Sequence, residues 1–337
     1  MAMAVTGEKL HPALYWKKLD KGRVKCLLCP FECALADGKI GICRGKQNIG
    51  GELFAINYGR TTSLNMDPIE KKPLYNFYPG TDILSIGPNS CNLGCDFCQN
   101  YFISQQSYPT QAISPEEAAE IAESKMSIGI AYTYTEPLVW YEYVLDTSKI
   151  ARDKGLKNVL VTNGTINPEP LEELLPFIDA MNIDIKSMDP RFYRKVCKGM
   201  LDPVLETTRR SAAKTHVEIT NLIIPGLNDS EEMFEKLTDF LAGVDPWIPL
   251  HFSRYHPDYK QTAPPTPMET LYRAADIASK KLKYVYIGNV STESHNQTRC
   301  PECGKTIIER SGYIVLKVAV TGGRCDYCGA ETKIVTK

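Results

Sequence analysis

Long apolar runs are missing from this sequence of 337 residues. A membrane-spanning helix needs about 18 or more consecutive apolar residues, and no stretch of the chain provides them. The first ten residues, Met1 to Leu10, also lack the continuous apolar stretch of a signal peptide. We therefore expect neither membrane insertion nor secretion, and we expect a cytoplasmic location.

An excess of either charge is missing as well. Lys and Arg number 39 and Asp and Glu number 40, which gives a formal net charge of −1, and the chain has no dense Lys/Arg block. Because nucleic-acid-binding proteins usually carry a basic excess, no nucleic-acid partner is expected. The G-x-G-x-x-G fingerprint of flavin or nicotinamide binding does not follow any predicted strand.

Cysteine, in contrast, is abundant, with 12 residues. A reducing cytosol disfavours disulfides, so this number indicates metal binding or catalysis. Four cysteines near the C-terminus form two C-x-x-C-G knuckles, whose glycines permit the turn that aims both thiolates of a knuckle at one ion. The alternative is a hairpin with free thiols. We predict a closed, structural zinc ribbon at Cys300, Cys303, Cys325 and Cys328.

A second set of four cysteines lies near the N-terminus, at Cys26, Cys29, Cys33 and Cys43. It occupies a loop-rich segment that contains glycine. Thiolates are soft ligands that suit both zinc and iron–sulfur clusters, so the donor type does not separate these two. The sequence predicts a metal site here, with zinc or another structural role as the favoured interpretation and an iron–sulfur cluster as the alternative.

The middle set differs in kind, because Cys91, Cys95 and Cys98 supply three thiolates within eight residues and no obvious fourth. Three ligands leave one position open, and on a four-iron cluster one iron is then free to bind a substrate or cofactor. The alternative is a zinc site completed by a distant His or by Cys197. We interpret Cys197 itself as a buried packing residue.

An α/β fold is indicated by short apolar or β-branched runs that alternate with helical patterns. The runs predict seven strands: Asp82 to Gly87, Ile128 to Tyr134, Asn158 to Thr162, Ala180 to Ile185, His216 to Ile224, Pro249 to Arg254 and Tyr284 to Asn289. Such repetition favours a parallel sheet. Cap residues predict helices that start at Ser114-Pro115, Asp229-Ser230 and Thr266-Pro267.

Polar side chains follow these predicted strands at their carboxyl ends, where ligands gather in parallel α/β folds. They are Glu136 after the second strand, Asn163 after the third, Asp184 and Lys186 at the fourth, and His251 with Arg254 on the sixth. Together they favour a site for a zwitterionic, sugar-bearing cofactor. Singly, Glu136 is also read as a helix cap, Asn163 as part of a turn, and Asp184 with Lys186 as an ion pair.

The middle cysteines match the C-x-x-x-C-x-Φ-C signature of the radical SAM superfamily in full, with Phe97 at the aromatic position. The sequence resembles that superfamily. The resemblance implies that Cys91, Cys95 and Cys98 hold a [4Fe-4S] cluster whose fourth iron chelates S-adenosylmethionine. It also implies that Phe97 lies against the adenine.

The stretch Asp67 to Tyr75, Cys98-Gln-Asn100 and the Cys-rich start resemble the radical SAM proteins of the AmmeMemoRadiSam system, which are related to pyruvate formate-lyase activating enzymes. This likeness covers nearly the whole chain.

Several further cofactor contacts follow from the likeness to the activating enzymes. It implies that Glu136 holds the methionyl ammonium, that Lys186 of the Asp184-x-Lys186 motif lies near ribose, and that His251 lies near the cofactor. Asn163-Gly164 matches the end of a further motif of those enzymes. Their Gly-Gly-Glu motif reads Tyr134-Thr135-Glu136 here, so the glycines are absent.

These observations predict a partial (β/α)6-type radical SAM barrel with a Cys-rich N-terminal segment and a C-terminal zinc ribbon. The expected boundaries are 1–80 for the Cys-rich segment, 81–292 for the barrel and 293–337 for the ribbon.

The predicted function is reductive cleavage of S-adenosylmethionine, which gives a 5′-deoxyadenosyl radical that abstracts hydrogen from an unidentified small molecule or partner protein. An external electron donor such as ferredoxin or flavodoxin is implied. One alternative is an activase for a glycyl-radical enzyme. An alternative of another class is a non-enzymatic zinc-binding interaction protein.

Overall fold

A single eight-stranded sheet forms the centre of the molecule. The computed structural model describes residues 10–290 and 295–336. The strand order is β15-β14-β13-β12-β11-β10-β8-β7, and all neighbours are parallel except the edge pair β7 and β8. The strands are β7 Ser63–Pro68, β8 Asp82–Gly87, β10 Gly129–Tyr132, β11 Lys157–Thr162, β12 Ala180–Asp184, β13 His216–Ile223, β14 Leu250–Arg254 and β15 Val285–Gly288. Since β7 and β15 do not pair with each other, the barrel is partial.

The seven parallel strands confirm the sequence prediction, and every predicted end lies within two residues of the observed one. They are buried along most of their length because helices cover them, which is why they appear in the sequence as nearly continuous apolar runs. Glycine permits close approach at one critical point. A Cβ on Gly87 would lie 2.1 Å from the carbonyl oxygen of Thr133, so Gly87 allows the ends of β8 and β10 to meet.

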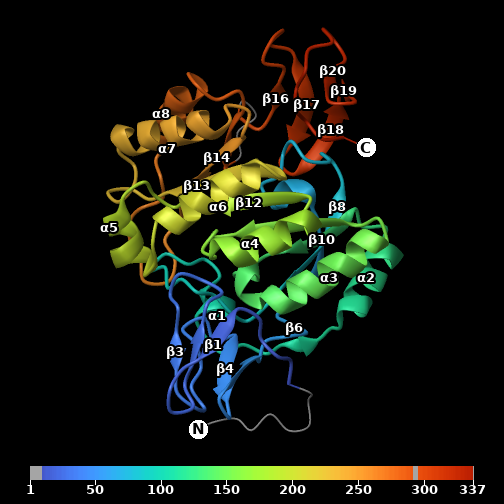
Figure 1. Cartoon of the computed structure of the whole chain (residues 1–337). Coiled ribbons are helices and arrows are strands. Elements are labelled where there is room, and N and C mark those ends of the chain that lie inside the picture. The colour runs from blue at the N-terminus through green and yellow to red at the C-terminus, as the bar shows by residue number, and fades with distance from the viewer. Residues whose placement is uncertain (1–9, 291–294, 337) are drawn as a thin grey trace.

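Helices lie on the outside of this sheet (Figure 1). The α-helices are α1 Tyr101–Ser104, α2 Pro115–Ser124, α3 Tyr141–Asp153, α4 Pro168–Leu174, α5 Pro190–Phe192, α6 Asp202–Ala212, α7 Glu231–Val244 and α8 Met268–Ser279. Short 3-10 turns are η1 Ile69–Lys71, η2 Pro137–Trp140 and η3 Leu175–Phe177, and η4 Tyr193–Cys197 is a π-helix. Within the described ranges, no helix is both long and apolar enough to cross a membrane.

Two of the three predicted helix caps are confirmed. Ser114 forms a full capping box with Glu117, and the Ser230 side chain accepts from the Met233 amide. The third cap was predicted wrongly, because Thr266 does not cap α8. Its hydroxyl accepts from the Tyr255 amide and donates to the carbonyl of Ile223, which ties the chain after β14 to the end of β13.

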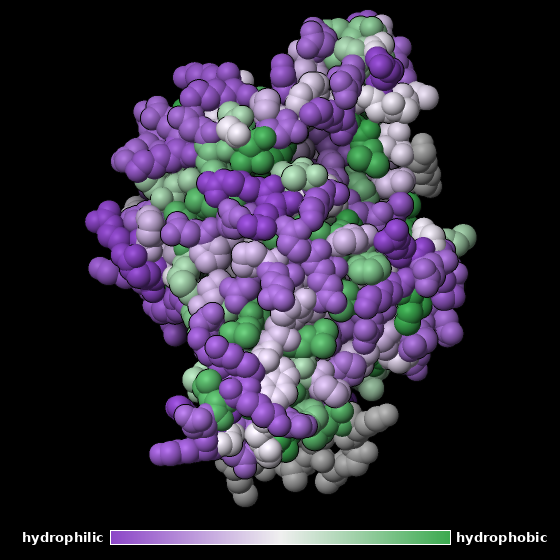
Figure 2. All heavy atoms as spheres, viewed as in Figure 1, coloured by the Kyte–Doolittle hydropathy of each residue, from purple (hydrophilic) through white to green (hydrophobic). Residues whose placement is uncertain are grey.

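Polar residues dominate the face shown in Figure 2, and hydrophobic ones form small separate patches between them. The helices therefore present polar faces to solvent and bury their apolar faces against the sheet, as amphipathic helices of a globular protein do.

The N-terminal segment folds as short antiparallel strands at one end of the barrel (Figure 1). They are β1 Trp16–Lys18, β2 Val24–Cys26, β3 Ala34–Leu35, β4 Lys46–Ile49, β5 Glu52–Ala55 and β6 Arg60–Thr61, the last of which pairs with β9 Gln111–Ala112. Val24, Leu28 and Leu53 are buried in the same hydrophobic core as the barrel residues. This segment is therefore packed into the barrel wall.

The C-terminal strands lie at the opposite end (Figure 1). They are β16 Thr298–Arg299, β17 Thr306–Ser311, β18 Ile314–Val318, β19 Val320–Thr321 and β20 Arg324–Cys325. They form a small core of their own, to which the barrel contributes Tyr75, Tyr284 and Tyr286. The predicted boundary at 292 and 293 lies outside the described residues. Of the predicted segment 1–80, β7 joins the central sheet.

Candidate active site

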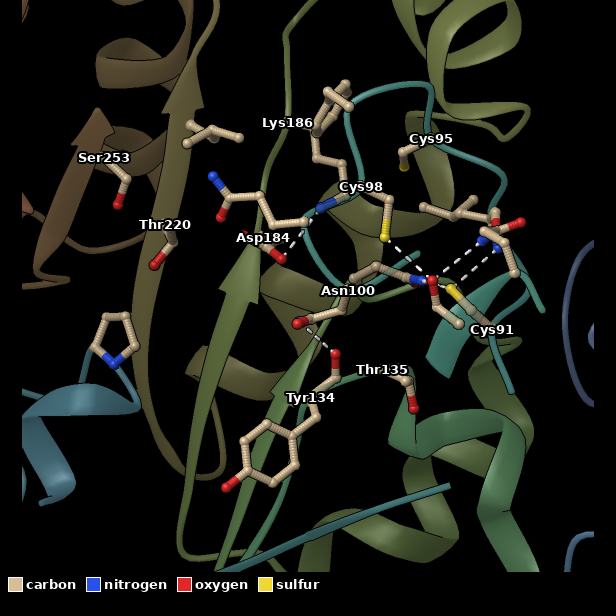
Figure 3. Close-up of a pocket in the computed structure, with 18 of the residues that line it drawn as sticks. Cys91, Cys95, Cys98, Asn100, Tyr134, Thr135, Asp184, Lys186, Thr220 and Ser253 are labelled. Carbon is tan, nitrogen blue, oxygen red and sulfur yellow. Dashed lines mark hydrogen bonds and ion pairs between the residues drawn. The ribbon is translucent and has the colours of Figure 1, made fainter. Parts of the chain in front are cut away.

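A cavity of about 260 Å³ lies at the carboxyl ends of the parallel strands (Figure 3). Its lining comes from the cysteine loop after β8 and from the ends of β10 to β15. The lining residues that bear on the chemistry are Cys91, Cys95, Phe97, Cys98, Asn100, Tyr134, Thr135, Asn163, Asp184, Lys186, Thr220, Ser253 and Asn289. The three cysteines occupy one side and Thr220 with Ser253 the other (Figure 3). The strand order therefore brings distant segments of the chain to one chamber.

The cysteine loop is held by backbone hydrogen bonds to the chain beyond β12. The amide of Gly94 donates to the Cys197 carbonyl at 2.9 Å, and the amide of Asp96 donates to the Val196 carbonyl at 3.0 Å. These carbonyls end the π-helix η4, and Lys198 follows with a left-handed φ of 58°. The loop is thus clamped at its centre, which fixes the positions of its thiols.

The three thiols lie in a largely buried setting, in which Cys95 is buried and Cys91 and Cys98 are partly exposed. Burial raises the pKa of the Cys91 and Cys98 thiols, so neither ionises readily by itself. The Sγ of Cys98 lies 3.1 Å from the Ser104 hydroxyl, and the Asn163 amide lies 3.8 Å from the Sγ of Cys91. Metal binding requires thiolates, so these groups suit a cluster that supplies positive charge.

The spacing of the three sulfurs does not match a single ion. Within the described residues, no His, Cys, Asp or Glu joins Cys91, Cys95 and Cys98 in a group whose ligand atoms all lie within 4.8 Å of one another. The alternative of a zinc site completed by Cys197 or a distant His is therefore not supported. Cys197 is fully buried and hydrogen-bonds with Cys95. A [4Fe-4S] cluster, whose thiolates stand farther apart, fits this set.

Asp184, Lys186 and Phe97 lie together beside the cysteines. The Nζ of Lys186 is 3.1 Å from Oδ2 of Asp184 and 5.9 Å from the centre of the Phe97 ring. The backbone of this strand end is held by Asn228, whose amide donates to the Lys186 carbonyl at 2.7 Å. The ion pair that the sequence offered as an alternative is present, and both of its members also line the cavity.

Glu136 was predicted as a cofactor contact, but it does not line this cavity. It is fully buried, and its two carboxylate oxygens accept hydrogen bonds from the Leu138 amide, the Thr162 hydroxyl and the Asn163 amide. Burial raises the pKa of Glu136 to about 7. This arrangement is the helix-cap alternative, and it also fixes the turn that carries Asn163 into the cavity.

His251 also lies outside this cavity, although it was predicted to contact the cofactor. Its Nε2 is 2.6 Å from Oε2 of Glu218, a fully buried carboxylate that also accepts from the amides of Tyr75 and Asn76. The physical reason is its position: His251 is the second residue of β14, whereas Ser253, two residues later, reaches the cavity.

A second cavity of about 490 Å³ adjoins the first, and His251 lies in its wall. Pro73, Ser253 and Asn289 line both cavities. The remaining polar lining residues are Glu70, Lys71, Tyr75, His251, Arg254, Asn296 and Tyr313. The last two lie beyond the barrel strands, on the C-terminal side of the chain. The two cavities thus share a boundary at the ends of β14 and β15.

Sequence reasoning missed the network that holds the Tyr134 loop. Tyr134 adopts a left-handed φ of 69°, its hydroxyl donates to Oδ2 of Asp67 at 2.7 Å, and its carbonyl accepts from the Asn100 amide at 2.7 Å. Lys72 pairs with the same carboxylate oxygen at 2.7 Å. The stretch around Asp67 and Lys72 carries part of the family resemblance, but only the fold shows that it supports the cavity wall.

The C-terminal cysteines form a compact four-thiol group. The Sγ atoms of Cys300 and Cys328 are 3.7 Å apart, those of Cys303 and Cys325 are 3.8 Å apart, and all four lie within 4.8 Å of one another. Two metal–sulfur bonds of about 2.3 Å at a tetrahedral angle place sulfurs about 3.8 Å apart. The group therefore fits one tetrahedral ion.

Comparisons with known proteins identify the family. The family model for the radical SAM superfamily matches residues 85–241. An uncharacterized protein of Methanocaldococcus jannaschii, MJ0808, is 46% identical over 97% of this chain and 100% of its own length. The pyruvate formate-lyase-activating enzyme of Clostridium pasteurianum is 24% identical over 49% of this chain and 72% of its own length.

A radical SAM methyltransferase of Sphaerobacter thermophilus shares the fold, with a TM-score of 0.51 and 17% identity over 63% of this chain and 67% of its own. The family domain implies S-adenosylmethionine and a [4Fe-4S] cluster. This finding sets aside the alternative of a non-enzymatic zinc protein. The chain belongs to the radical SAM superfamily and is a radical SAM enzyme.

Proposed function

We propose that the cavity beside the cysteine loop holds the cluster and S-adenosylmethionine, and that the adjoining cavity holds a polar substrate from which hydrogen is abstracted. The observation that carries this proposal is the shared boundary of the two cavities at Pro73, Ser253 and Asn289. A radical formed in the first cavity would then lie next to a substrate in the second, with only this shared boundary between them. Because such a radical reacts with what lies nearest, proximity decides the reaction.

The cofactor side of the proposal assigns roles to residues that line the first cavity. Cys91, Cys95 and Cys98 hold the cluster, which together with S-adenosylmethionine supplies reductive cleavage to a carbon radical when bound. The ion pair of Asp184 and Lys186 offers an acceptor and a donor for ribose hydroxyls. In this proposal, these residues bind the cluster and S-adenosylmethionine and orient the cofactor.

Phe97 and Asn163 complete the cofactor side. The Phe97 ring is 4% exposed and offers an apolar face for a base. Asn163 is held by Glu136 through its amide nitrogen and by Asn92 through its side chain at 3.0 Å. Its fixed side chain therefore presents a polar contact at the cysteine side of the cavity.

The lining of the second cavity favours a polar substrate. Arg254 and Lys71 supply positive charge, and Tyr75, His251 and Tyr313 supply polar groups on aromatic rings. A volume of about 490 Å³ suits a small molecule or one side chain of a larger partner. The class of substrate that follows is a polar compound or residue with both hydrogen-bonding and planar parts.

The reaction needs one electron for each cleavage, and the sequence has no flavin or nicotinamide fingerprint. We therefore include an external one-electron donor of the ferredoxin or flavodoxin class in the proposal. The cofactor itself supplies the difficult chemistry, while the chain binds, orients and excludes water.

The test is anaerobic reconstitution of the protein with iron and sulfide, followed by reduction with dithionite in the presence of S-adenosylmethionine. The expected product is 5′-deoxyadenosine, with the Cys95→Ala variant as the matched control that forms none. A fully loaded wild-type cluster that cleaves no S-adenosylmethionine would overturn the proposal.

A glycyl-radical-enzyme activase is the second candidate, favoured by the similarity to the Clostridium pasteurianum activating enzyme. In that case the second cavity receives a glycine-bearing loop of a partner protein. Incubation with a candidate partner then yields a glycyl radical signal in electron paramagnetic resonance. Its absence, together with 5′-deoxyadenosine formation that responds to small polar compounds, excludes this candidate.

A further inference from the structure

The N-terminal cysteines gather around one narrow cavity beside the active site. Cys26, Cys29, Cys33 and Cys43 all line it, together with Ile42, Lys46 and Asn92. The sulfurs accept hydrogen bonds from backbone amides: Leu28 donates to Cys26, Phe31 to Cys29, and Gly45 and Lys46 to Cys43. A set of inward-facing sulfurs held by amides is a prepared ligand set for a metal group.

The spacing of these sulfurs separates a single ion from a cluster. Among the residues that the structure describes, the ribbon cysteines are the group whose ligand atoms all lie within 4.8 Å of one another. The N-terminal set does not meet that spacing, although a tetrahedral ion would hold its four sulfurs about 3.8 Å apart. In this respect it resembles Cys91, Cys95 and Cys98, the set that matches the cluster motif.

We infer that Cys26, Cys29, Cys33 and Cys43 bind a second iron–sulfur cluster, of the four-iron type, that relays electrons to the first. Four thiolates saturate the irons of such a cluster, so no position is left for S-adenosylmethionine or substrate. The relay role rests on the proposed function, because it needs the first cluster in place. Cluster binding at the N-terminal set does not.

Two short contact paths join the two cysteine sets. Arg44, which follows Cys43, donates from its guanidinium to the Ser104 carbonyl, and the Ser104 hydroxyl is 3.1 Å from the Sγ of Cys98. The second path runs through Asn92, which lines the N-terminal cavity and is the neighbour of Cys91 in sequence. Two residues therefore separate the cysteine sets along the first path, and one residue separates them along the second.

Exposure sets the direction of the relay. Cys29 and Cys33 are partly exposed. Cys43, which leads to Arg44, is buried. An electron therefore enters from the outer side of the N-terminal set and leaves on the inner side.

The proposed step is an electron transfer, in which no bond forms or breaks and no proton moves. A one-electron donor protein that carries a flavin or an iron–sulfur cluster is oxidised by one electron, and the N-terminal cluster is reduced by one. That electron then passes to the cluster on Cys91, Cys95 and Cys98, which returns the N-terminal cluster to its oxidised state.

The first arm of the test removes the active-site ligands and keeps the N-terminal set. A Cys91→Ala, Cys95→Ala, Cys98→Ala variant is reconstituted anaerobically with iron, sulfide and zinc, beside the wild-type protein. The wild type is expected to hold about eight iron ions and the variant about four, with a reduced-cluster paramagnetic signal that S-adenosylmethionine does not alter. A variant that holds no iron and gains a second zinc ion overturns the inference.

The second arm removes the N-terminal ligands with a Cys29→Ser, Cys43→Ser variant, whose fold is checked by circular dichroism. It is expected to keep about four iron ions and a signal that S-adenosylmethionine alters. Dithionite still drives formation of 5′-deoxyadenosine in this variant, whereas reduction by flavodoxin is lost. Equal rates with both reductants in variant and wild type overturn the relay.

The two proposals fail in different ways. If the wild type cleaves no S-adenosylmethionine while the triple variant still holds about four iron ions, the proposed function fails and the N-terminal cluster stands. If the wild type is active and the triple variant holds no iron, the proposed function stands and the N-terminal cluster fails. If the serine variant does not fold, the iron content of the triple alanine variant, in which the N-terminal set is intact, decides whether the N-terminal cluster exists.

Discussion

The N-terminal and C-terminal cysteine sets offer the same four thiolates but differ in their surroundings. The N-terminal set lines a cavity next to the active site and shares the core of the barrel. The ribbon set lies in a separate small core at the far end of the molecule, with sulfurs at the spacing of one ion. The distance between sulfurs, rather than their number or type, distinguishes the two sites.

Both segments are fastened to the barrel by a buried ion pair. Lys46 of β4 pairs with Glu142 of α3, and Arg310 of β17 pairs with Glu70 at 3.5 Å. All four side chains are at most 2% exposed. Because the two ion pairs are alike, variants that break them show whether a change comes from lost packing between a segment and the barrel or from lost metal.

The largest expected effect follows the loss of the ribbon's metal. Cys303→Ala removes one ligand of the tight group, and a four-thiolate zinc site contributes about 10 kcal/mol or more to the folding of its segment. We expect zinc and ribbon structure to be lost and the iron content to stay unchanged, as measured by metal analysis and by hydrogen exchange of the ribbon amides.

The matched control for this comparison is Cys95→Ala, which is expected to lose the active-site iron and to keep the ribbon folded. Equal retention of iron in both variants would contradict the assignment of the two sites.

The next largest effect is expected when the buried ion pair between the ribbon and the barrel, Arg310 with Glu70, is broken. Arg310→Met leaves Glu70 as an unpaired buried carboxylate and also removes a 2.6 Å hydrogen bond to the Tyr75 carbonyl. Removal of one partner of a buried pair costs about 3–5 kcal/mol, which urea unfolding measures. The double variant with Glu70→Leu should recover part of this loss. If it recovers none, the ion pair is not the source of the effect.

The corresponding change at the other end is Lys46→Met. It leaves Glu142 buried, although that carboxylate still accepts from the Leu14 amide at 2.9 Å, so we expect a somewhat smaller loss of about 3 kcal/mol. Lys46 also lines the N-terminal cysteine cavity. Iron content should therefore fall in this variant and stay constant in Arg310→Met, and the same iron content in both would remove the distinction between the two ends.

Acid should weaken the ribbon end through Glu218. Although burial alone raises the pKa of this carboxyl, hydrogen bonds from His216 and His251 lower it from 4.5 to about 2. Because the pKa is lower in the folded state, the stabilisation is complete above pH 4.5 and is lost as pH falls toward 2. The loss is on the order of 3 kcal/mol.

Urea unfolding between pH 5 and 2 measures this acid effect, read from the ribbon tyrosines Tyr313 and Tyr327 and from Trp247, which packs against the ribbon core. Glu218→Gln is the control, because it removes the titrating group, and its stability should vary less across this range. An unchanged pH dependence would place the acid-sensitive group elsewhere.

The smallest expected effect comes from Ser114→Ala at the start of α2, a helix that carries none of the cysteines. Loss of the capping box costs about 1 kcal/mol. Urea unfolding should register this loss while iron and zinc content both stay at the wild-type values. Loss of either metal here would mean that any destabilisation empties the sites, and the comparison between the two ends would then lose its basis.

Sequence patterns predicted the parallel sheet and the position of the cysteine loop well, because both depend on local signals. A strand buried on both faces appears as a continuous apolar run, and the motif Cys91 to Cys98 lies directly after such a run. The caps at Ser114 and Ser230 depend on the next three residues and were confirmed for the same reason.

The remaining features depend on tertiary contacts that no local pattern carries. Thr266 has the sequence of a helix cap, yet its hydroxyl bonds to the ends of two strands. His251 lies on the expected strand, but the carboxylate of Glu218 from the neighbouring strand binds it away from the cysteine cavity. Ser104 and Arg44, which connect the cysteine sets, lie outside every motif.

The second cavity is completed by Gly312 and Tyr313, which belong to the turn between β17 and β18 of the ribbon. One wall of the proposed substrate chamber thus comes from the segment that carries the four-thiol group of Cys300, Cys303, Cys325 and Cys328. We expect a chain that lacks the proposed ribbon metal to form the radical beside an open wall, where the radical would attack the protein itself. If both proposals hold, the ribbon couples the capacity to react to the presence of a chamber able to contain the reaction.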